Sequence, residues 1–118
     1  MKKKLLLYIS ILIIAFSSFN VRSSFNPFLG TDHFTEAILQ TYFAINASDL
    51  NAIVKHAQQA TKHAVATRYD VSQEVDHQLI DRGIQSLIIV VEEGTSGNIE
   101  AARKAAHNAL VFITQSAR

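Results

Sequence analysis

The sequence contains no cysteine and no tryptophan, and its single methionine is Met1. Without cysteine the chain can form no disulfide bond, no zinc–thiolate site, no covalent haem attachment and no thiol nucleophile. Removal of Met1 with an N-terminal leader would also remove the one thioether that could bind copper. Stability must therefore come from apolar packing, and any metal ion would have to bind imidazole and carboxylate groups.

Proline and glycine are also scarce, with one proline and four glycines. Both residue types disfavour helix, so their positions mark the breaks between helices. Pro27 and Gly30 predict an extended lead-in over residues 25–31, after which Thr31 or Asp32 could cap a first helix. The segment 94–98, which reads GTSGN, predicts a helix stop followed by a turn.

The N-terminus has the layout of a secretory signal peptide. Residues 2–4 are all lysine, residues 5–16 form a nearly unbroken apolar run, and small serines follow. The alternative is a membrane anchor, but spanning a bilayer takes about 20 apolar residues, more than this run supplies. We therefore predict that residues 1–24 are a signal peptide and that the protein is periplasmic or secreted, with no membrane association after cleavage.

Removal of the leader would change the charge of the protein. Four of the eleven basic residues lie in residues 1–24, and all ten acidic residues lie after them. The remaining chain then has seven basic and ten acidic residues, which gives a formal net charge of −3. A basic surface of the kind that binds nucleic acid is therefore not expected.

The strongest pattern in the chain is a near-repeat. Residues 32–64 and 81–113 align without a gap, and each copy reads as helix, short polar turn, helix. The aligned pairs include Asp32 with Asp81, Ile38 with Leu87, Leu50 with Ile99, Ala57 with Ala106, and Ala60 with Ala109. Two such hairpins can bury each other's apolar faces. We predict an all-α fold for residues 25–118: an antiparallel up-and-down four-helix bundle made of two repeated hairpins, 32–68 and 76–115.

Apolar residues recur at helical spacing in four segments, which predicts helices over about 32–45, 49–68, 76–93 and 99–115. Ser48 is the predicted N-cap of the second helix. Residues 88–91 (IIVV) could form a short strand, but the 3.6-residue pattern that continues across them favours helix. The predicted inward residues include, in the first helix, Phe34, Ala37, Ile38, Thr41, Tyr42 and Ile45, and in the third, Ile80, Ile84, Leu87, Ile88 and Val91.

Five histidines are the candidate metal ligands: His33, His56, His63, His77 and His107. In an antiparallel bundle, His33 and His63 would lie at similar heights, with His77 at the same pole. His56 and His107 would share a second level. Acidic residues lie near both groups: Asp32, Glu36, Asp76 and Asp81 near the first, and Glu100 near the second. Mixed imidazole and carboxylate ligands suit copper, zinc or nickel. The alternative is that the histidines are ordinary solvated side chains.

Other patterns exclude several kinds of site. His56 and His63 are two helical turns apart, about 10 Å, which is too far to share one ion. No histidine pair has the i, i+4 spacing that chelates a metal on one helix. The sequence also lacks the paired Glu-x-x-His motifs of a di-iron bundle and the Gly-rich turn of a serine nucleophile. We therefore expect that the protein is not an enzyme.

The repeat and several short segments resemble the small metal-binding protein family, which consists of histidine-rich periplasmic four-helix bundles. The matching segments cover roughly residues 33–115: His33 with Glu36-Ala37-Ile38, Lys55-His56-Ala57 with Lys62-His63-Ala64, Gly83-Ile84 with Gly94-Thr95-Ser96-Gly97, and Ala105-Ala106-His107-Asn108-Ala109-Leu110. The resemblance implies loose binding of divalent metals, copper foremost, at several surface histidines. It also implies metal handling or buffering in place of catalysis.

The resemblance implies that His33, His56, His63 and His107 are candidate metal ligands. The predicted height of His77 in the bundle adds it as a fifth candidate. Family members have more histidines, and this chain has other residues where a histidine might be expected: Gln40, Gln58, Ala105 and Phe112. A second hypothesis is therefore a structural or protein-interaction bundle that has lost most of its metal capacity. Apolar residues outside the predicted core agree with self-association or a protein partner: Leu39, Phe43, Ile89 and Phe112.

Overall fold

A computed structural model describes residues 32–118. These residues form four helices: α3 (His33–Asn46), α4 (Leu50–Tyr69), α5 (His77–Thr95) and α6 (Ile99–Gln115). Over this range there is no strand, only an isolated antiparallel bridge between Val75 and Ala117. The all-α prediction is confirmed, and residues 88–91 are helical. The predicted signal peptide, the lead-in 25–31 and the possible cap Thr31 lie outside the described residues.

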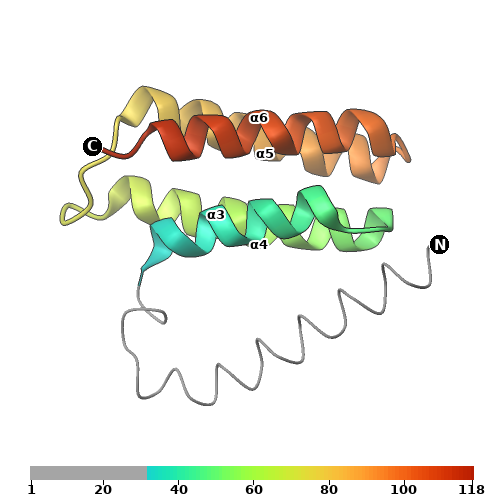
Figure 1. The fold of residues 1–118 in the computed structure, drawn as a ribbon, viewed down its shortest axis with the longest axis horizontal. Helices are drawn as coiled ribbons and strands as arrows, with labels where there is room; N and C mark the ends of the chain where they lie inside the picture. The colour runs from blue at the N-terminus through green and yellow to red at the C-terminus, as the bar shows by residue number, and fades with distance from the viewer. Residues whose placement is uncertain (1–31) are drawn as a thin grey trace, which may run out of the picture. The chain divides into compact units, whose positions relative to one another are not determined.

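The four helices form a bundle in which α3 lies beside α4 and α5 lies beside α6 (Figure 1). The two pairs stack through contacts of α4 with α5 and of α3 with α6. His33 contacts His63 and Gln40 contacts His56, so a step forward along α3 is a step backward along α4. The chain reverses again between α4 and α5 and between α5 and α6 (Figure 1). The four-helix bundle predicted from the sequence is confirmed.

Short side chains at the N-terminal ends of three helices explain where these helices begin. Asp49 accepts a hydrogen bond from the backbone N–H of Ala52 at 2.8 Å and caps α4. Asp76 caps α5, and Asn98 caps α6 by the same geometry. Each cap satisfies backbone donors that have no partner within the helix. The predicted cap Ser48 was wrong: its hydroxyl oxygen is buried without a hydrogen-bond partner, because the following residue occupies the capping position.

The interior of the bundle is built largely from alanine. The fully buried alanines are Ala37, Ala44, Ala47, Ala57, Ala60, Ala64, Ala102, Ala106 and Ala109. Larger side chains fill the space between them, and the largest that are fully buried include Ile53, Ile80, Leu87 and Ile113. Small residues let neighbouring helices approach closely.

Two residues predicted to point inward are exposed. Tyr42 is 53% exposed and Ile88 is 44% exposed. Both predictions were wrong because the edge of an apolar stripe is sensitive to how far its helix is rotated in the bundle. Of the apolar residues predicted outside the core, Ile89 is 45% exposed. The other three, Leu39, Phe43 and Phe112, are partly buried.

Two glycines in α5 allow its close packing. A Cβ atom at Gly83 would lie 2.6 Å from Cγ1 of Ile113 in α6. One at Gly94 would lie 2.5 Å from Cγ2 of Val54 in α4. Gly97 has a different role, because its φ of 90° closes the turn between α5 and α6 in a conformation that favours glycine.

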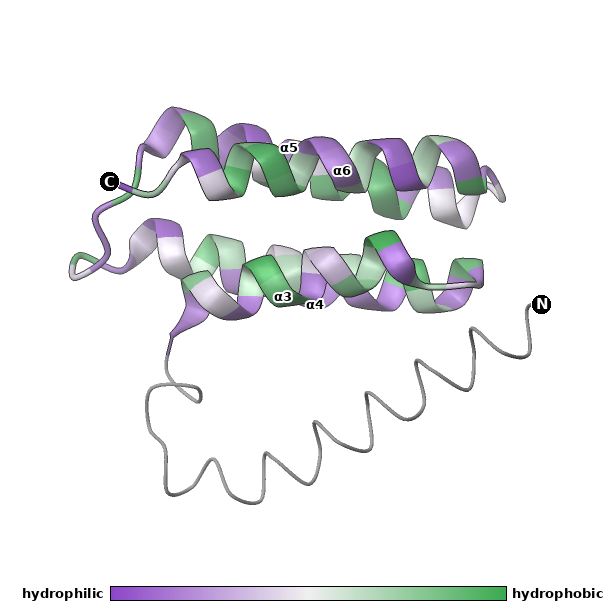
Figure 2. Cartoon of the chain, in the orientation of Figure 1, coloured by the Kyte–Doolittle hydropathy of each residue, from purple (hydrophilic) through white to green (hydrophobic). Residues whose placement is uncertain are grey.

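The two hairpin turns fall at corresponding positions of the predicted repeat. Asn46 ends α3 and Leu50 begins α4, while Thr95 ends α5 and Ile99 begins α6. Both pairs are related by the offset that aligns Leu50 with Ile99 in the sequence. Hydrophobic residues recur along all four helices with hydrophilic residues between them (Figure 2). These correspondences support a duplicated hairpin, which stays a prediction. No helix within residues 32–118 is long and apolar enough to cross a membrane.

Candidate metal site

The structure brings together two of the five predicted histidines. His33 is the first residue of α3, and His63 lies on the part of α4 that faces α3. Their Nδ1 atoms are 2.9 Å apart, and their ring centroids are 5.1 Å apart with a tilt of 32°. At this distance one ring donates its Nδ1–H and the other accepts it through the Nδ1 lone pair. The predicted similarity in height of these two residues therefore extends to direct contact between their rings.

The surroundings of His63 favour its neutral form. Burial lowers the pKa of His63 below the ordinary value of 6.5, and the nearby charges of His33 and Lys62 lower it further. If the neutral pair took up one more proton, both Nδ1 atoms could carry a hydrogen, and the hydrogen bond between them would be lost. Nitrogen lone pairs are thus available near neutral pH, as a metal ligand requires.

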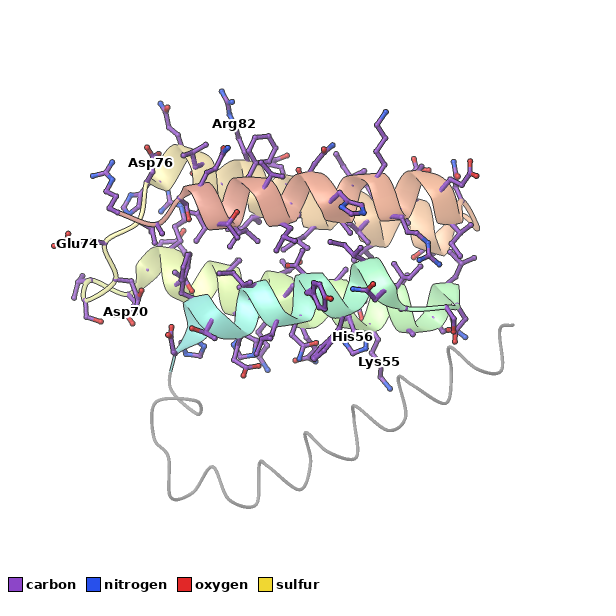
Figure 3. All side chains as sticks on the ribbon, viewed as in Figure 1. Lys55, His56, Asp70, Glu74, Asp76 and Arg82 are labelled. Atoms are coloured by element: carbon purple, nitrogen blue, oxygen red, sulfur yellow. The ribbon has the colours of Figure 1, made fainter. Side chains whose placement is uncertain are left out.

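Asp70 is an acidic residue near this pair that the sequence did not indicate. It directly follows α4, and its carboxylate accepts hydrogen bonds from the backbone and hydroxyl of Ser72. These two bonds lower the pKa of Asp70, and the charge of His33 lowers it further. Asp70 therefore adds negative charge to the end of the bundle where His33 lies (Figure 3). The signal for it was its position two residues beyond the predicted end of the second helix at residue 68.

Two of the acidic residues predicted near the histidines have other partners. Asp81 forms a two-pronged ion pair with Arg68, which joins α5 to α4. Asp76 caps α5 and lies 3.7 Å from the guanidinium of Arg118. Hydrogen bonds from the backbone N–H groups of Leu79 and Gln78 lower the pKa of Asp76, and Arg118 lowers it by a smaller amount. Both carboxylates already have cationic or backbone partners, so they are poorly placed to bind a metal as well.

His56 also lies where α3 and α4 contact each other, a surface that we call the α3–α4 seam. It is seven residues before His63 on α4. Its Nδ1 is 2.8 Å from the amide oxygen of Gln40, and its ring centroid is 5.5 Å from that of Phe43. Burial lowers the pKa of His56, and the charge of Lys55 contributes to the same shift. Figure 3 shows His56 and Lys55 on the side of the α3–α4 pair that faces away from α5 and α6. The His56 side chain is partly buried there.

The remaining two histidines are exposed. His77, the first residue of α5, lines a surface pocket together with Val75, Asp76, Gln78 and Arg118. His107 lies on the outer part of α6. The sequence predicted that His77 would lie at the height of the His33–His63 pair and that His107 would lie at the height of His56. Within residues 32–118, neither His77 nor His107 forms a side-chain hydrogen bond or ring contact with another histidine.

Within residues 32–118, no group of three or more histidine, cysteine or carboxylate side chains is arranged to hold one metal ion. The His33–His63 pair can therefore supply two ligands, and water or a ligand from outside the described residues would complete the coordination. Imidazole pairs of this kind bind copper, nickel and zinc.

The model of one protein family, described as small metal-binding protein, matches residues 1–116. No curated protein and no solved structure matches the chain. The family match spans nearly the whole sequence and agrees with the observed helical bundle and with the resemblance noted from the histidine-bearing segments. The chain belongs to the small metal-binding protein family.

Proposed function

We propose that this protein binds divalent transition metals weakly and exchangeably through the imidazoles of His33 and His63, and that its role is metal handling or buffering. The observation that carries the proposal is the 2.9 Å separation of the two Nδ1 atoms, which come from different helices. Membership of a metal-binding family supports it independently. A metal ion would take the place of the hydrogen that the two rings share.

Copper is the favoured ion, because affinity for nitrogen ligands rises along the divalent series to Cu²⁺ and then falls at Zn²⁺. The two Nδ1 atoms already lie 2.9 Å apart, so both rings are close enough to bind one ion. Each ring must also turn so that its lone pair points at the metal, and the donor ring would then carry its hydrogen on Nε2.

Weak binding follows from the number of protein ligands. Two imidazoles leave the other coordination positions to water, so the ion is held loosely and can be passed on. The isolated histidines, His56, His77 and His107, would each add a still weaker site. We propose no catalytic role, because the sequence carries neither the paired Glu-x-x-His motifs of a di-iron bundle nor the Gly-rich turn of a serine nucleophile.

Export of the protein is part of the proposal. The lysine-rich start and the apolar run of residues 5–16 support a cleaved leader and a periplasmic or secreted mature chain. Mass spectrometry of the protein from an exporting host would give the cleavage bond. An intact N-terminus in a cytoplasmic fraction would reject this part.

The test of metal binding is calorimetric titration of the purified protein with Cu²⁺ and with Zn²⁺. The comparison protein carries alanine at all five histidines: His33, His56, His63, His77 and His107. The intact protein should bind copper more tightly than zinc, and the variant should lose binding to both. Equal weak binding by the two proteins would reject histidine coordination.

A protein-interaction role is the alternative, and it rests on exposed apolar side chains. Ile89 is 45% exposed and Val111 is 50% exposed, on the outer faces of α5 and α6. Exposed apolar area of this kind favours association when it is contiguous. Gel filtration at several concentrations, without metal, tests self-association directly. A monomer at every concentration would leave the alternative without its main support.

A further inference from the structure

We propose that Gln40 is a positioning residue that fixes the tautomer of His56 and thereby makes the Nε2 atom of His56 a metal ligand. The inference rests on the metal-binding function proposed above and adds to it. It assigns a role to Gln40, which stands where the family resemblance led us to expect a histidine.

The chemistry follows from the hydrogen bond between the two side chains. Nδ1 of His56 is 2.8 Å from Oε1 of Gln40. An amide oxygen only accepts hydrogen bonds, so Nδ1 of His56 must carry the hydrogen. In the neutral ring Nε2 then has a free lone pair. Metal-binding histidines in proteins characteristically donate their second ring N–H to such an acceptor, which fixes both tautomer and ring orientation.

Packing supports the same orientation. The His56 ring lies against Phe43, with the centroids 5.5 Å apart and the planes at 54°. Both contacts come from α3, whereas His56 belongs to α4, so the ring is held between two helices. Burial, which lowers the pKa of His56, also favours the neutral ring.

The His33–His63 pair and the Gln40–His56 pair occupy equivalent places on one seam. Gln40 is seven residues after His33 on α3, and His56 is seven residues before His63 on α4. In the first pair both Nδ1 atoms face each other. In the second pair the glutamine oxygen fills the place of one ring, so Nδ1 of His56 is occupied and Nε2 is left to bind. The seam thus provides a two-imidazole site and, about two turns away, a site with one oriented imidazole.

The tautomer can be measured before any metal is added. Two-bond ¹H–¹⁵N correlation spectra of the metal-free protein at pH 7.5 should show His56 with the hydrogen on Nδ1. The variant Gln40→Leu should lose this preference, and Gln40→Glu should keep it because a carboxylate accepts the same hydrogen bond. A His56→Ala variant assigns the signals. The inference is overturned if His56 carries its hydrogen on Nε2, or if Gln40→Leu leaves the tautomer unchanged.

The metal readout uses substoichiometric Cu²⁺ as the probe, because paramagnetic copper broadens most strongly the signals of the rings that bind it. A His33→Ala, His63→Ala background removes broadening of His56 by an ion at the neighbouring pair. Gln40→Leu should weaken copper binding at His56 about tenfold, the lower end of what loss of such an outer partner costs. Gln40→Glu should retain it, and the His33 and His63 signals should respond to copper alike in all three proteins.

The outcomes separate the two proposals. If copper broadens His33 and His63 but not His56, the function stands and the role of Gln40 is rejected. If copper broadens His56 equally with and without the glutamine, the role of Gln40 is again rejected. If copper broadens none of these rings, the metal-binding function itself fails, and the role of Gln40 fails with it.

Discussion

The histidines of the α3–α4 seam differ from solvated histidines because each ring has a specific partner. His33 and His63 bond to each other, and His56 bonds to Gln40. The hydrogen bonds fix which nitrogen of His56 carries hydrogen, and they share one hydrogen between the other two rings. Partial burial also disfavours the charged form of His56 and His63, which lowers the pKa of both side chains.

This burial predicts that acid destabilises the fold. The pKa values of His56 and His63 are lowered below 6.5 in the folded protein, so below that pH the unfolded chain binds more protons than the folded chain. The free energy of unfolding should fall as the pH drops through and below 6.5, and recover as the pH rises above it. Urea unfolding at pH 5.0, 6.5 and 8.0 measures this dependence.

The matched comparison for this prediction is His63→Gln against His107→Gln. Loss of His63 should flatten the pH dependence, whereas loss of the exposed His107 should leave most of it. A pH dependence that is the same in both variants would show that burial of His63 does not cause it.

At this scale the sequence predicted part of the candidate site. The pairing of His33 with His63 could be predicted, because hairpin geometry places the two residues at one height. Applying the same seven-residue step in both helices also pairs Gln40 with His56, and that signal was missed. The ring nitrogen that faces the partner could not be predicted, because it depends on side-chain rotation of individual rings.

Three of the four described helices, α4, α5 and α6, begin at a capping side chain. Small residues make up much of the buried face of the bundle. Observed helix ends lie within about two residues of the prediction, because turn and capping residues are distinctive in the sequence. The exact cap of α4 could not be predicted, since Ser48 and Asp49 are consecutive and both are good caps. The rotation of α3 and α5 was also only partly predictable, and the exposure of Tyr42 and Ile88 depends on it.

The cap assignment predicts opposite results for two neighbouring substitutions. Asp49→Ala should lower the free energy of unfolding by about 1 kcal/mol, because it removes the acceptor of the Ala52 N–H. Ser48→Ala should cost little or stabilise slightly, because the buried Ser48 hydroxyl oxygen has no partner to lose. Urea unfolding of both variants at pH 7.5 measures the difference. A larger loss for Ser48→Ala than for Asp49→Ala would contradict the assignment.

Residues 33–118 form a four-helix bundle whose alanine-rich interior depends on close helix contacts. The sequence has no cysteine, so no disulfide bond contributes. The fold class could be predicted because helical periodicity, short turns and the near-repeat all agree. Whether histidines from different helices converge could not, because it depends on bundle rotation. The structure shows that His33 and His63 are in contact, and the family match supports the proposal that this pair binds a metal ion.

The His33–His63 pair is proposed as the principal metal site, and calorimetric titration with Cu²⁺ of two double variants tests this directly. One variant carries His33→Ala with His63→Ala, and the other His77→Ala with His107→Ala. Each removes two imidazoles, so the number of histidines is matched. The first variant should lose the tightest copper site, and the second should retain it with unchanged affinity. Equal loss in both variants, or loss in the second alone, would show that the principal site lies elsewhere.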